Sequence, residues 1–475
     1  MQPLKLTISG SFWDSQIYAG RLYLFTDTGA IRTLDWDLVV SEWQIDQRLR
    51  LAMECAFRRS GDLYASDFSL LLHDPEIKHI IFSKFDELGT KELILDTRDN
   101  KGLVGEQDTP FPFPHSDSII YQSQMYIGTS VGLFRATCDK RTVRPVSTKP
   151  EKKWDGPSLN IAASYGEIAV AAGDYGLFEV PVQRLNAKAP RATLEKSCNK
   201  CSWNFQSIYC TGPAQSGWLA EFEKIKKDAE GVTSRRFTKE LSSEDIFGEQ
   251  GFTWSQQDKM YLATMDGLKV ARYIPWLEKD KRLARYRDAI PLPRREEVLA
   301  GAAANFGTVL EYKDSITVLQ SDNDVFNIPG DPVTWRIFPK RKHYENQLHV
   351  IFEDRLEIYS FNHDYFLDQD SKRLGTTNFR FGGLGSRYQW RDVAETDVDD
   401  LLETRRRSRC GRYRLEDRFR VEPPAPYSAS RVVLPAKPRY RKVAHGPTES
   451  LTSSRDCRGG KDAGTAICSG RGCFG

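Results

Sequence analysis

The chain has 475 residues, a formal net charge of +3 and a low mean hydropathy of −0.52. No stretch approaches the roughly 18 consecutive apolar residues of a membrane-spanning helix, and the N-terminus lacks the basic and apolar regions of a signal peptide. The sequence therefore predicts a cytoplasmic protein without a membrane span, with one large β domain and an extension.

The charge is unevenly divided along the chain. Residues 371–475 hold 22 Lys and Arg against 12 Asp and Glu, whereas residues 1–370 hold 46 against 53. A mildly acidic body, at about −7, is therefore predicted to carry a basic extension of about +10. The aromatic content of 11% and the ten Trp residues suit a packed, sheet-rich core.

The predicted elements begin with a strand at Leu4–Ser9, where apolar and polar residues alternate. One pattern then recurs: a strand, a polar turn, a strand ending in a small residue, a turn closed by glycine, and a further strand. The copies are Gln16–Asp37, Ser118–Asp139, Ile161–Val182 and Phe252–Tyr273. Each closing glycine suits a turn that needs a positive φ.

The spacing of the closing glycines predicts a repeat. Gly132 and Gly176 are 44 residues apart, while the intervals from Gly29 to Gly132 and from Gly176 to Gly267 are 103 and 91 residues. The long intervals are about twice a period of roughly 45 residues, which is typical of four-stranded propeller blades. Each should therefore contain a further unit, for which the candidates are Leu63–Asp96 and Gln206–Phe222.

Two strand groups follow, at Val309–Ile328 and Trp335–Phe361. They lie closer together than one period, so we count them as one blade and predict seven blades in total. A ring of six or eight blades is the nearest alternative, because the units around Leu63 and Gln206 are weakly marked and Val309–Phe361 also allows a division into two blades. In such a ring Leu4–Ser9 would complete the last blade beside Trp335–Phe361, which removes two sheet edges at once.

The sequence Gly-Thr-x-x-Gly-Leu-Phe at Gly128–Phe134 resembles the hairpin step of β-propeller repeats of the two-component-regulator type. The chain is also WD40-like in its period, but it lacks the regular Gly-His and Trp-Asp pairs of WD40 repeats. The resemblance covers the pattern of about residues 1–365. It implies an all-β propeller fold. Together with the repeat count and the composition, the sequence predicts a seven-bladed β-propeller followed by a basic, partly disordered C-terminal extension.

Three connecting segments have distinctive compositions. Lys101–His115 is rich in Gly and Pro, and its Phe111 and Phe113 either tuck over a blade or contact a partner protein. Glu221–Glu240 is charged and is expected to form a short exposed helix or a long hairpin. Trp276–Glu297 is strongly charged with helical character, and we expect it to run over the surface between blades.

The composition changes after Asp370, so the predicted domains are a propeller at 1–365, a basic extension at 366–422 and a disordered tail at 423–475. Asp392–Arg409 is expected to form a helix, because its acidic start and Arg-rich end both suit the helix dipole. The candidate interaction residues here are Arg405, Arg406, Arg407, Arg409, Arg412 and Arg414. With Tyr413 and Phe419 they suit nucleic acid or an acidic partner, or they form a solvated helix end.

The common catalytic motifs are absent from the sequence: it has no phosphate-binding loop, no His-Glu-x-x-His and no Gly-x-Ser-x-Gly. The seven histidines are scattered, so we predict no catalytic residue, no metal site and no cofactor. Cys198 and Cys201 have the spacing of a zinc clip, but no second pair follows at the usual distance. The nine cysteines therefore suggest reduced thiols in the cytoplasm.

A repeat ring without a catalytic motif favours a non-enzymatic scaffold or recognition subunit that binds one or more proteins. A propeller hydrolase or lyase with a site at the axial channel is the alternative, and a nucleic-acid-associated subunit is the second alternative. Convergence of several His, Asp or Arg residues near the axis would favour the enzyme. Small or apolar residues along the channel, together with an apolar patch on one face, would favour the scaffold.

Overall fold

The computed structural model describes the residues that follow: 2–60, 74–96, 102–138, 145–182, 191–213, 217–224, 235–256, 259–275, 277, 282–286, 289–304, 306–320, 325–339, 341, 343–361 and 390–392. All of them belong to one unit of the chain, Met1–Pro435. Within this described part, no helix has the length and apolar character needed to cross a membrane.

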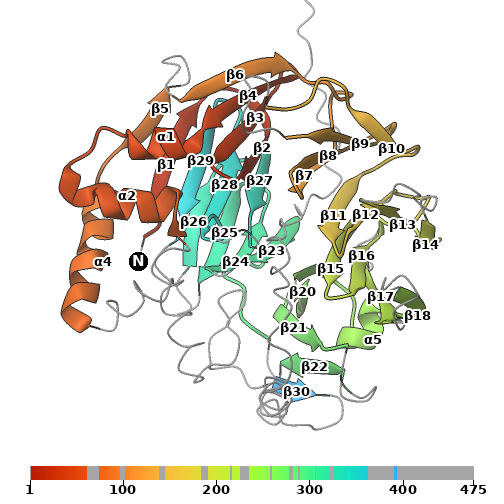
Figure 1. Ribbon diagram of the computed structural model, residues 1–475. Helices are drawn as coiled ribbons and strands as arrows, with labels where there is room; N and C mark the ends of the chain where they lie inside the picture. Colours follow the sequence, from red (N-terminus) through yellow and green to blue (C-terminus); the bar gives the residue numbers. More distant parts are fainter. Residues whose placement is uncertain are drawn as a thin grey trace, which may run out of the picture. The chain divides into compact units, whose positions relative to one another are not determined.

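The described strands form a seven-bladed β-propeller (Figure 1). Blade 1 consists of β2 (Phe12–Tyr18), β3 (Arg21–Thr26), β4 (Ala30–Asp35) and β6 (Leu103–Asp108). Blade 2 consists of β7 (Asp117–Tyr121), β8 (Gln124–Thr129), β9 (Gly132–Thr137) and β10 (Glu151–Trp154). Blade 3 consists of β11 (Asn160–Ser164), β12 (Glu167–Ala171), β13 (Leu177–Pro181) and β14 (Arg191–Leu194). In each blade consecutive strands pair antiparallel, and the first strand of one blade lies next to the first strand of the following blade.

The remaining blades repeat this order. Blade 4 consists of β15 (Lys200–Asn204), β16 (Ser207–Thr211), β17 (Gly217–Lys224) and β18 (Arg235–Ser242). Blade 5 consists of β19 (Phe252–Gln256), β20 (Lys259–Thr264), β21 (Gly267–Tyr273) and β22 (Leu283–Tyr286). Blade 6 consists of β23 (Ala300–Ala304), β24 (Gly307–Glu311), β25 (Ser315–Gln320) and β26 (Val325–Pro329). A short strand, β30 (Trp390–Asp392), pairs with β22 at the outer edge of blade 5.

Blade 7 joins the two ends of the ring. It consists of β27 (Thr334–Ile337), β28 (Gln347–Ile351), β29 (Arg355–Ser360) and β1 (Leu4–Ser9), with Leu4 opposite Ser360 in an antiparallel pair. The predicted closure by the first strand is therefore confirmed. A further strand, β5 (Leu93–Asp96), pairs with β1 in parallel and widens this blade to five strands.

Two of the predicted units were wrong, and the errors offset each other. Leu63–Asp96 forms no blade in its described part: Pro75–Gly89 is helix α4, and β5 belongs to blade 7. Helix α4 begins where the Asp74 carboxylate accepts hydrogen bonds from the N–H groups of Glu76 and Ile77. Val309–Phe361, counted as one blade, contributes to blades 6 and 7. The predicted number of seven therefore holds, although one unit was misplaced and one was merged.

The helical insertion lies between the third and fourth strands of blade 1. Its described helices are α1 (Trp36–Ser41), the 3-10 helix η1 (Gln47–Leu49), α2 (Arg50–Phe57) and α4. They pack with β1 and β5 in one apolar cluster that includes Trp36, Met53, Phe57, Phe85 and Leu88. The insertion thus covers blade 7 with a second layer.

The outer strands were missed because their side chains are mostly polar. The predicted loop Lys101–His115 contains β6, and the segment Trp276–Glu297, expected to be helical, contains β22. Only one side of an outer strand meets another strand of its blade, so it carries little apolar alternation; in β6 no side chain is fully buried. The charged segment Glu221–Glu240 forms the long hairpin of β17 and β18, one of its two predicted forms, and is followed by α5 (Ser243–Phe247).

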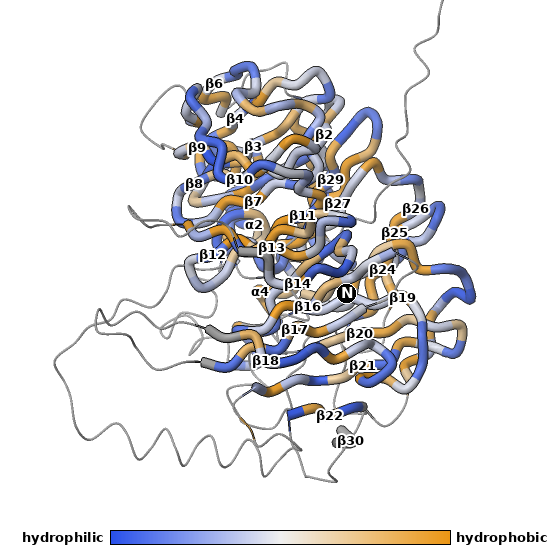
Figure 2. The backbone as a smooth tube through the Cα atoms, turned by 90° about the vertical axis from the view of Figure 1, so that its right-hand side faces the viewer, coloured by the Kyte–Doolittle hydropathy of each residue, from blue (hydrophilic) through white to orange (hydrophobic). Residues whose placement is uncertain are grey.

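The closing glycines are required on two grounds. Gly176 has a φ of +95° and Gly267 a φ of +141°, which side chains disfavour. A Cβ at Gly176 would also collide with the carbonyl oxygen of Leu194, and one at Gly267 would lie 2.6 Å from that of Ile290. The glycine therefore lets the outer strand approach the second turn. Figure 2 shows the resulting pattern, with hydrophobic strands inside and hydrophilic turns at their ends.

Candidate functional site

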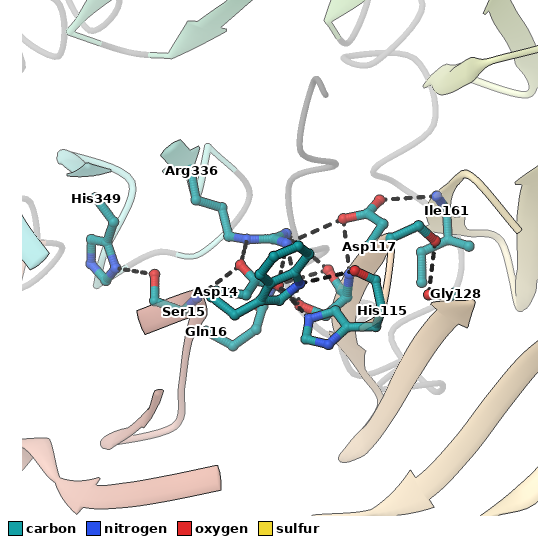
Figure 3. A network of polar contacts seen from close by, with 12 residues as sticks. Asp14, Ser15, Gln16, His115, Asp117, Gly128, Ile161, Arg336 and His349 are labelled. Carbon is teal, nitrogen blue, oxygen red and sulfur yellow. Dashed lines mark hydrogen bonds and ion pairs between the residues drawn. The ribbon is translucent and has the colours of Figure 1, made fainter. Parts of the chain in front are cut away.

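The first strands of blades 7, 1, 2 and 3 carry polar side chains that face one another at the place where the ring closes (Figure 3). Asp14 lies in β2, Asp117 begins β7, and Arg336 lies in β27. All three side chains are at most 2% exposed. Buried charges must be paired and hydrogen-bonded to be tolerated, so their contacts decide what this cluster does.

Arg336 joins three blades. Its Nε and Nη2 atoms donate to the two carboxylate oxygens of Asp14 at 2.9 and 2.8 Å, a bidentate pair. Nη2 also lies 3.1 Å from Asp117 Oδ1, and Nη1 donates to the Ser118 carbonyl oxygen at 2.8 Å. The guanidinium of the last blade is therefore held by the first strands of blades 1 and 2.

A chain of hydrogen bonds continues from Asp14 around the ring. Asp14 Oδ2 accepts from Ser118 Oγ at 2.6 Å, and Asp117 Oδ2 accepts from Asn160 Nδ2 at 2.7 Å and from the Ile161 N–H at 3.0 Å. Asn160 Oδ1 in turn accepts from the Cys201 N–H at 2.9 Å. A side chain near the start of each first strand thus contacts the first strand of the next blade.

His115 also contacts Asp14. Its Nε2 atom lies 3.2 Å from Asp14 Oδ2, and its ring meets Phe25 edge-on at a centroid distance of 4.7 Å. The connection from blade 1 to blade 2, which carries His115, is thereby fixed to the same carboxylate. The carbonyl oxygen of His115 accepts a hydrogen bond from Trp13 Nε1 at 2.9 Å.

A second arm of the network leads to the helical insertion. His349 Nδ1 lies 3.1 Å from Ser15 Oγ, and its Nε2 lies 3.3 Å from Gln347 Oε1. Gln347 Nε2 donates to the carbonyl oxygen of Phe57, the last residue of α2, at 2.9 Å. Burial, reinforced by the nearby Arg336 and Arg341, lowers the pKa of His349 to about 3, so this imidazole is neutral near pH 7.

Arg341 is buried beside the network and has no carboxylate partner among the described residues. Its Nη2 donates to Gln16 Oε1 at 3.1 Å, and its guanidinium lies over the rings of Tyr18 and Phe338 at 5.4 and 5.3 Å. Burial lowers the pKa of Arg341 to about 9. Its positive charge is therefore stabilised mainly by aromatic faces.

This arrangement can hold blades together. Both carboxylates are engaged by protein donors and shielded from water, so in this conformation they present no general base or nucleophile to a substrate. Convergence of Asp, His and Arg residues was our criterion for an enzyme, and the residues do converge. Because these residues are buried, we infer that they hold neighbouring blades together. We call the contacts of Arg336 with Asp14 and Asp117 the Asp14–Arg336 clasp.

The predicted interaction residues have different outcomes. The six Arg residues between Arg405 and Arg414 lie outside the described residues, and so does most of the helix expected at Asp392–Arg409. Phe111 is buried and packs with Phe25 and Ile31. Phe113 is 37% exposed and meets the Trp13 ring edge-on at 5.6 Å.

The two cysteines with zinc-clip spacing lie in the core of blades 3 and 4. Cys198 and Cys201 are buried together with Cys210, which lies directly opposite Cys201 in the β15–β16 pair. Burial raises the pKa of the Cys201 and Cys210 thiols, so they are poor nucleophiles. Across the described ranges, no group of three or more His, Cys, Asp or Glu side chains is arranged to hold a metal ion.

The sequence contained one signal for this network that our reading missed. Residues 14–18 read Asp-Ser-Gln-Ile-Tyr and residues 117–121 read Asp-Ser-Ile-Ile-Tyr. The two stretches occupy the first strands of blades 1 and 2, and each carboxylate accepts from the N–H of the following Ser at 2.8 Å. A charged residue repeated at one position of an otherwise apolar strand indicates a buried polar contact.

No known family model matches this sequence, and no curated protein matches it either. Among solved structures, the chain is similar to the AfRom2 CNH domain, with 13% identity, a TM-score of 0.35, and coverage of 53% of this chain and 82% of that one. For BamB from Moraxella catarrhalis the values are 11%, 0.35, 55% and 89%. For BBS1N, solved in complex with ARL6DN, they are 9%, 0.41, 76% and 97%. The assignment of seven blades rests on the strand pairing within this chain.

Proposed function

We propose that this protein is a cytoplasmic, non-enzymatic scaffold or recognition subunit that binds one or more proteins in a multi-subunit assembly. The observation that carries the proposal is the contrast between its buried polar groups and its exposed apolar ones. The charged groups of the Asp14–Arg336 clasp are buried and bond one blade to the next. Large apolar side chains such as Tyr175 and Met265, each 67% exposed, lie instead at the tips of turns. Apolar side chains gathered on one surface mark protein contacts, and binding residues are concentrated on loops.

The alternative is a propeller enzyme, and one observation favours it: Asp14, Asp117, His115 and Arg336 come together near the first strands. For catalysis, the cluster would have to open to a substrate and give up its interblade bonds. Such an opening would cost several kcal/mol, because it exposes paired buried charges. The scaffold is therefore the better supported function.

Affinity purification of the full chain, followed by mass spectrometry, tests the proposal. We expect proteins that co-purify with the wild type and are lost from the double variant Tyr175→Ser/Met265→Ser. The matched control is Leu51→Ser/Ile80→Ser, which removes exposed apolar side chains from the helical insertion instead. A monomer that captures nothing, or capture that both double variants reduce equally, would count against this proposal.

The Arg-rich segment Arg405–Arg420 is proposed as a tethered interaction element outside the propeller. Its charge supports contact with an acidic surface, and nucleic acid is the second candidate partner. Deletion of Asp392–Gly475 should leave the melting temperature of the ring unchanged and should reduce partner capture more at low than at moderate salt. A truncated chain that melts unchanged and binds everything would show that the segment has no such role.

A further inference from the structure

Five of the exposed large apolar side chains lie at the same end of the blades. They are Phe113, Val131, Tyr175, Met265 and Val333, with exposed fractions between 37% and 67%. Val131, Tyr175 and Met265 occupy turns between second and third strands, while Phe113 and Val333 occupy connections between blades. Because the strands of a blade alternate in direction, these turns and connections share one end of the ring.

We call this end the connection face. Among the described residues, it consists of the turns 27–29, 130–131, 172–176, 212–213, 265–266, 312–314 and 352–354, and of the connections 10–11, 109–116, 155–159, 195–199, 243–251, 289–299 and 330–333. Hydrogen bonds join the two sets: the Gly10 N–H donates to the Asp354 carbonyl oxygen, and Ser197 Oγ donates to Asp174 Oδ1. Turns and connections therefore form one surface.

The connection face is strongly acidic. Its described residues include fourteen Asp and Glu but only four Lys and Arg. Two turns place an exposed acid directly beside an exposed apolar side chain, as Asp174-Tyr175 in blade 3 and Met265-Asp266 in blade 5. A cationic chain that also carries aromatic rings would complement both features.

We propose that the connection face binds the chain's own segment Arg405–Arg420. This segment carries eight Arg residues against two acids, and Tyr413 and Phe419 are interleaved among them. The exposed apolar side chains are spread over several blades, which suits an extended segment better than a compact domain. The inference rests on the proposed function, because the segment is the tethered interaction element proposed above.

The length of chain permits the contact. Strand β30 ends at Asp392 on the outer edge of blade 5, thirteen residues before Arg405. Thirteen residues span roughly 20 Å as the helix expected from the sequence, at about 1.5 Å each, and roughly 40 Å when extended, so in either form the segment can reach toward the turn of the same blade at Met265-Asp266. A tether this short also gives a high effective concentration, which favours the internal contact over binding to a second copy.

Limited digestion of the full-length protein with a protease that cleaves only after arginine tests the contact. Cleavage after Arg405, Arg406 and Arg407 is followed by mass spectrometry at low and high salt. We expect slow cleavage at low salt and about tenfold faster cleavage in the variant Asp174→Lys/Asp266→Lys, since reversal of two charges removes much of the attraction. Tyr175→Ser/Met265→Ser should accelerate cleavage by about threefold, because these side chains add apolar contact.

The matched control is Asp86→Lys/Glu92→Lys, which reverses two exposed charges on the helical insertion and should leave the cleavage rate unchanged. Equal rates in the wild type and in both connection-face variants would overturn the inference, as would protection that disappears on dilution and so requires a second molecule. The digestion needs no partner protein, so its failure would leave the co-purification result, and with it the proposed function, intact.

Discussion

The two sides of the ring hold their first strands together by different chemistry. Between blades 7, 1, 2 and 3 the contacts are charged and directional, with Arg336, Asp14 and Asp117 at their centre. Between blades 5 and 6 the first strands meet through packing: the ring of Trp254 in β19 lies against Gly301 in β23, whose sequence is Ala-Gly-Ala-Ala-Ala. The polar side is also the side where the first strand of the chain, β1, pairs with β29 of blade 7.

This difference suggests a division of labour. Apolar packing stabilises neighbouring blades but tolerates small shifts, whereas a bidentate ion pair fixes orientation. The contact that closes the ring joins residues far apart in the sequence, because β1 at Leu4–Ser9 pairs with β29 at Arg355–Ser360, and it therefore has to select the correct strand among many similar ones. We therefore hypothesise that the Asp14–Arg336 clasp specifies closure, while the apolar side supplies most of the stability.

The largest effect should follow from breaking the clasp. Arg336→Met leaves the carboxylates of Asp14 and Asp117 buried without their common partner, and we expect a loss of about 3–5 kcal/mol in unfolding free energy. Urea unfolding measures this loss. The control Arg32→Met removes a partly exposed ion pair with Glu106 in blade 1 and should cost less than about 1 kcal/mol. Equal losses in the two variants would refute the special role of the clasp.

The polar side should also make the ring sensitive to acid. The folded-state pKa of His349 is about 3, below its ordinary value of 6.5, so the unfolded chain takes up the proton first as the pH falls. The stability that this residue contributes is therefore complete above pH 6.5 and is lost toward pH 3, with a slope of up to about 1.4 kcal/mol per pH unit. His349→Gln should flatten the pH dependence of the unfolding free energy between pH 6.5 and 4.5, measured by urea unfolding at each pH. An unchanged slope in His349→Gln would contradict the assignment.

Between blades 5 and 6, the test is to add a methyl group to the packed contact of Gly301 with Trp254. A Cβ at Gly301 would lie 2.8 Å from the Trp254 ring, which is buried and stacked on Tyr261 at 5.1 Å. Gly301→Ala should therefore cost about 1–3 kcal/mol in chemical denaturation, because the indole has to shift. Gly89→Ala is the control: its Cβ would meet only the end of the Leu4 side chain, at 3.4 Å, so this variant should not be destabilised. An unchanged unfolding free energy in Gly301→Ala would mean that the contact between β19 and β23 is loosely packed.

The sequence was informative wherever the local pattern carried apolar alternation and turn chemistry. The inner three strands around Gly29, Gly132, Gly176 and Gly267 were found because each is apolar and ends in a turn that needs glycine. The closure by Leu4–Ser9 followed from the need to remove sheet edges. Such local rules hold in a propeller, since each blade is one repeated unit.

The rest depended on contacts between distant residues. Spacing alone could not show that the long interval after Gly29 holds a helical insertion, nor that Val309–Phe361 spans two blades. The apolar residues of α4 occur at helical spacing, whereas the period of the repeat predicts a blade at this place. Arg336 and Asp14 are 322 residues apart in the sequence, so no local pattern predicts their contact. Only the repeated Asp-Ser pairs indicate that the two Asp residues have a shared role.

The smallest effect is expected at the boundary between the two sides, where the polar chain ends. Thr211 Oγ1 donates to the Thr253 carbonyl oxygen at 3.2 Å, joining blades 4 and 5 through a neutral hydrogen bond with no charged partner. Thr211→Val keeps the shape and removes the donor, so the expected loss is at most about 1 kcal/mol, measured by urea unfolding. Ser118→Ala gives the matched comparison, since it removes a hydroxyl that donates to the buried Asp14 carboxylate at 2.6 Å, and bonds to charged groups are worth about 1.5–3 kcal/mol. If Thr211→Val costs as much as Ser118→Ala, the polar character of the ring does not end at blade 4, and the contrast between its two sides would have to be abandoned.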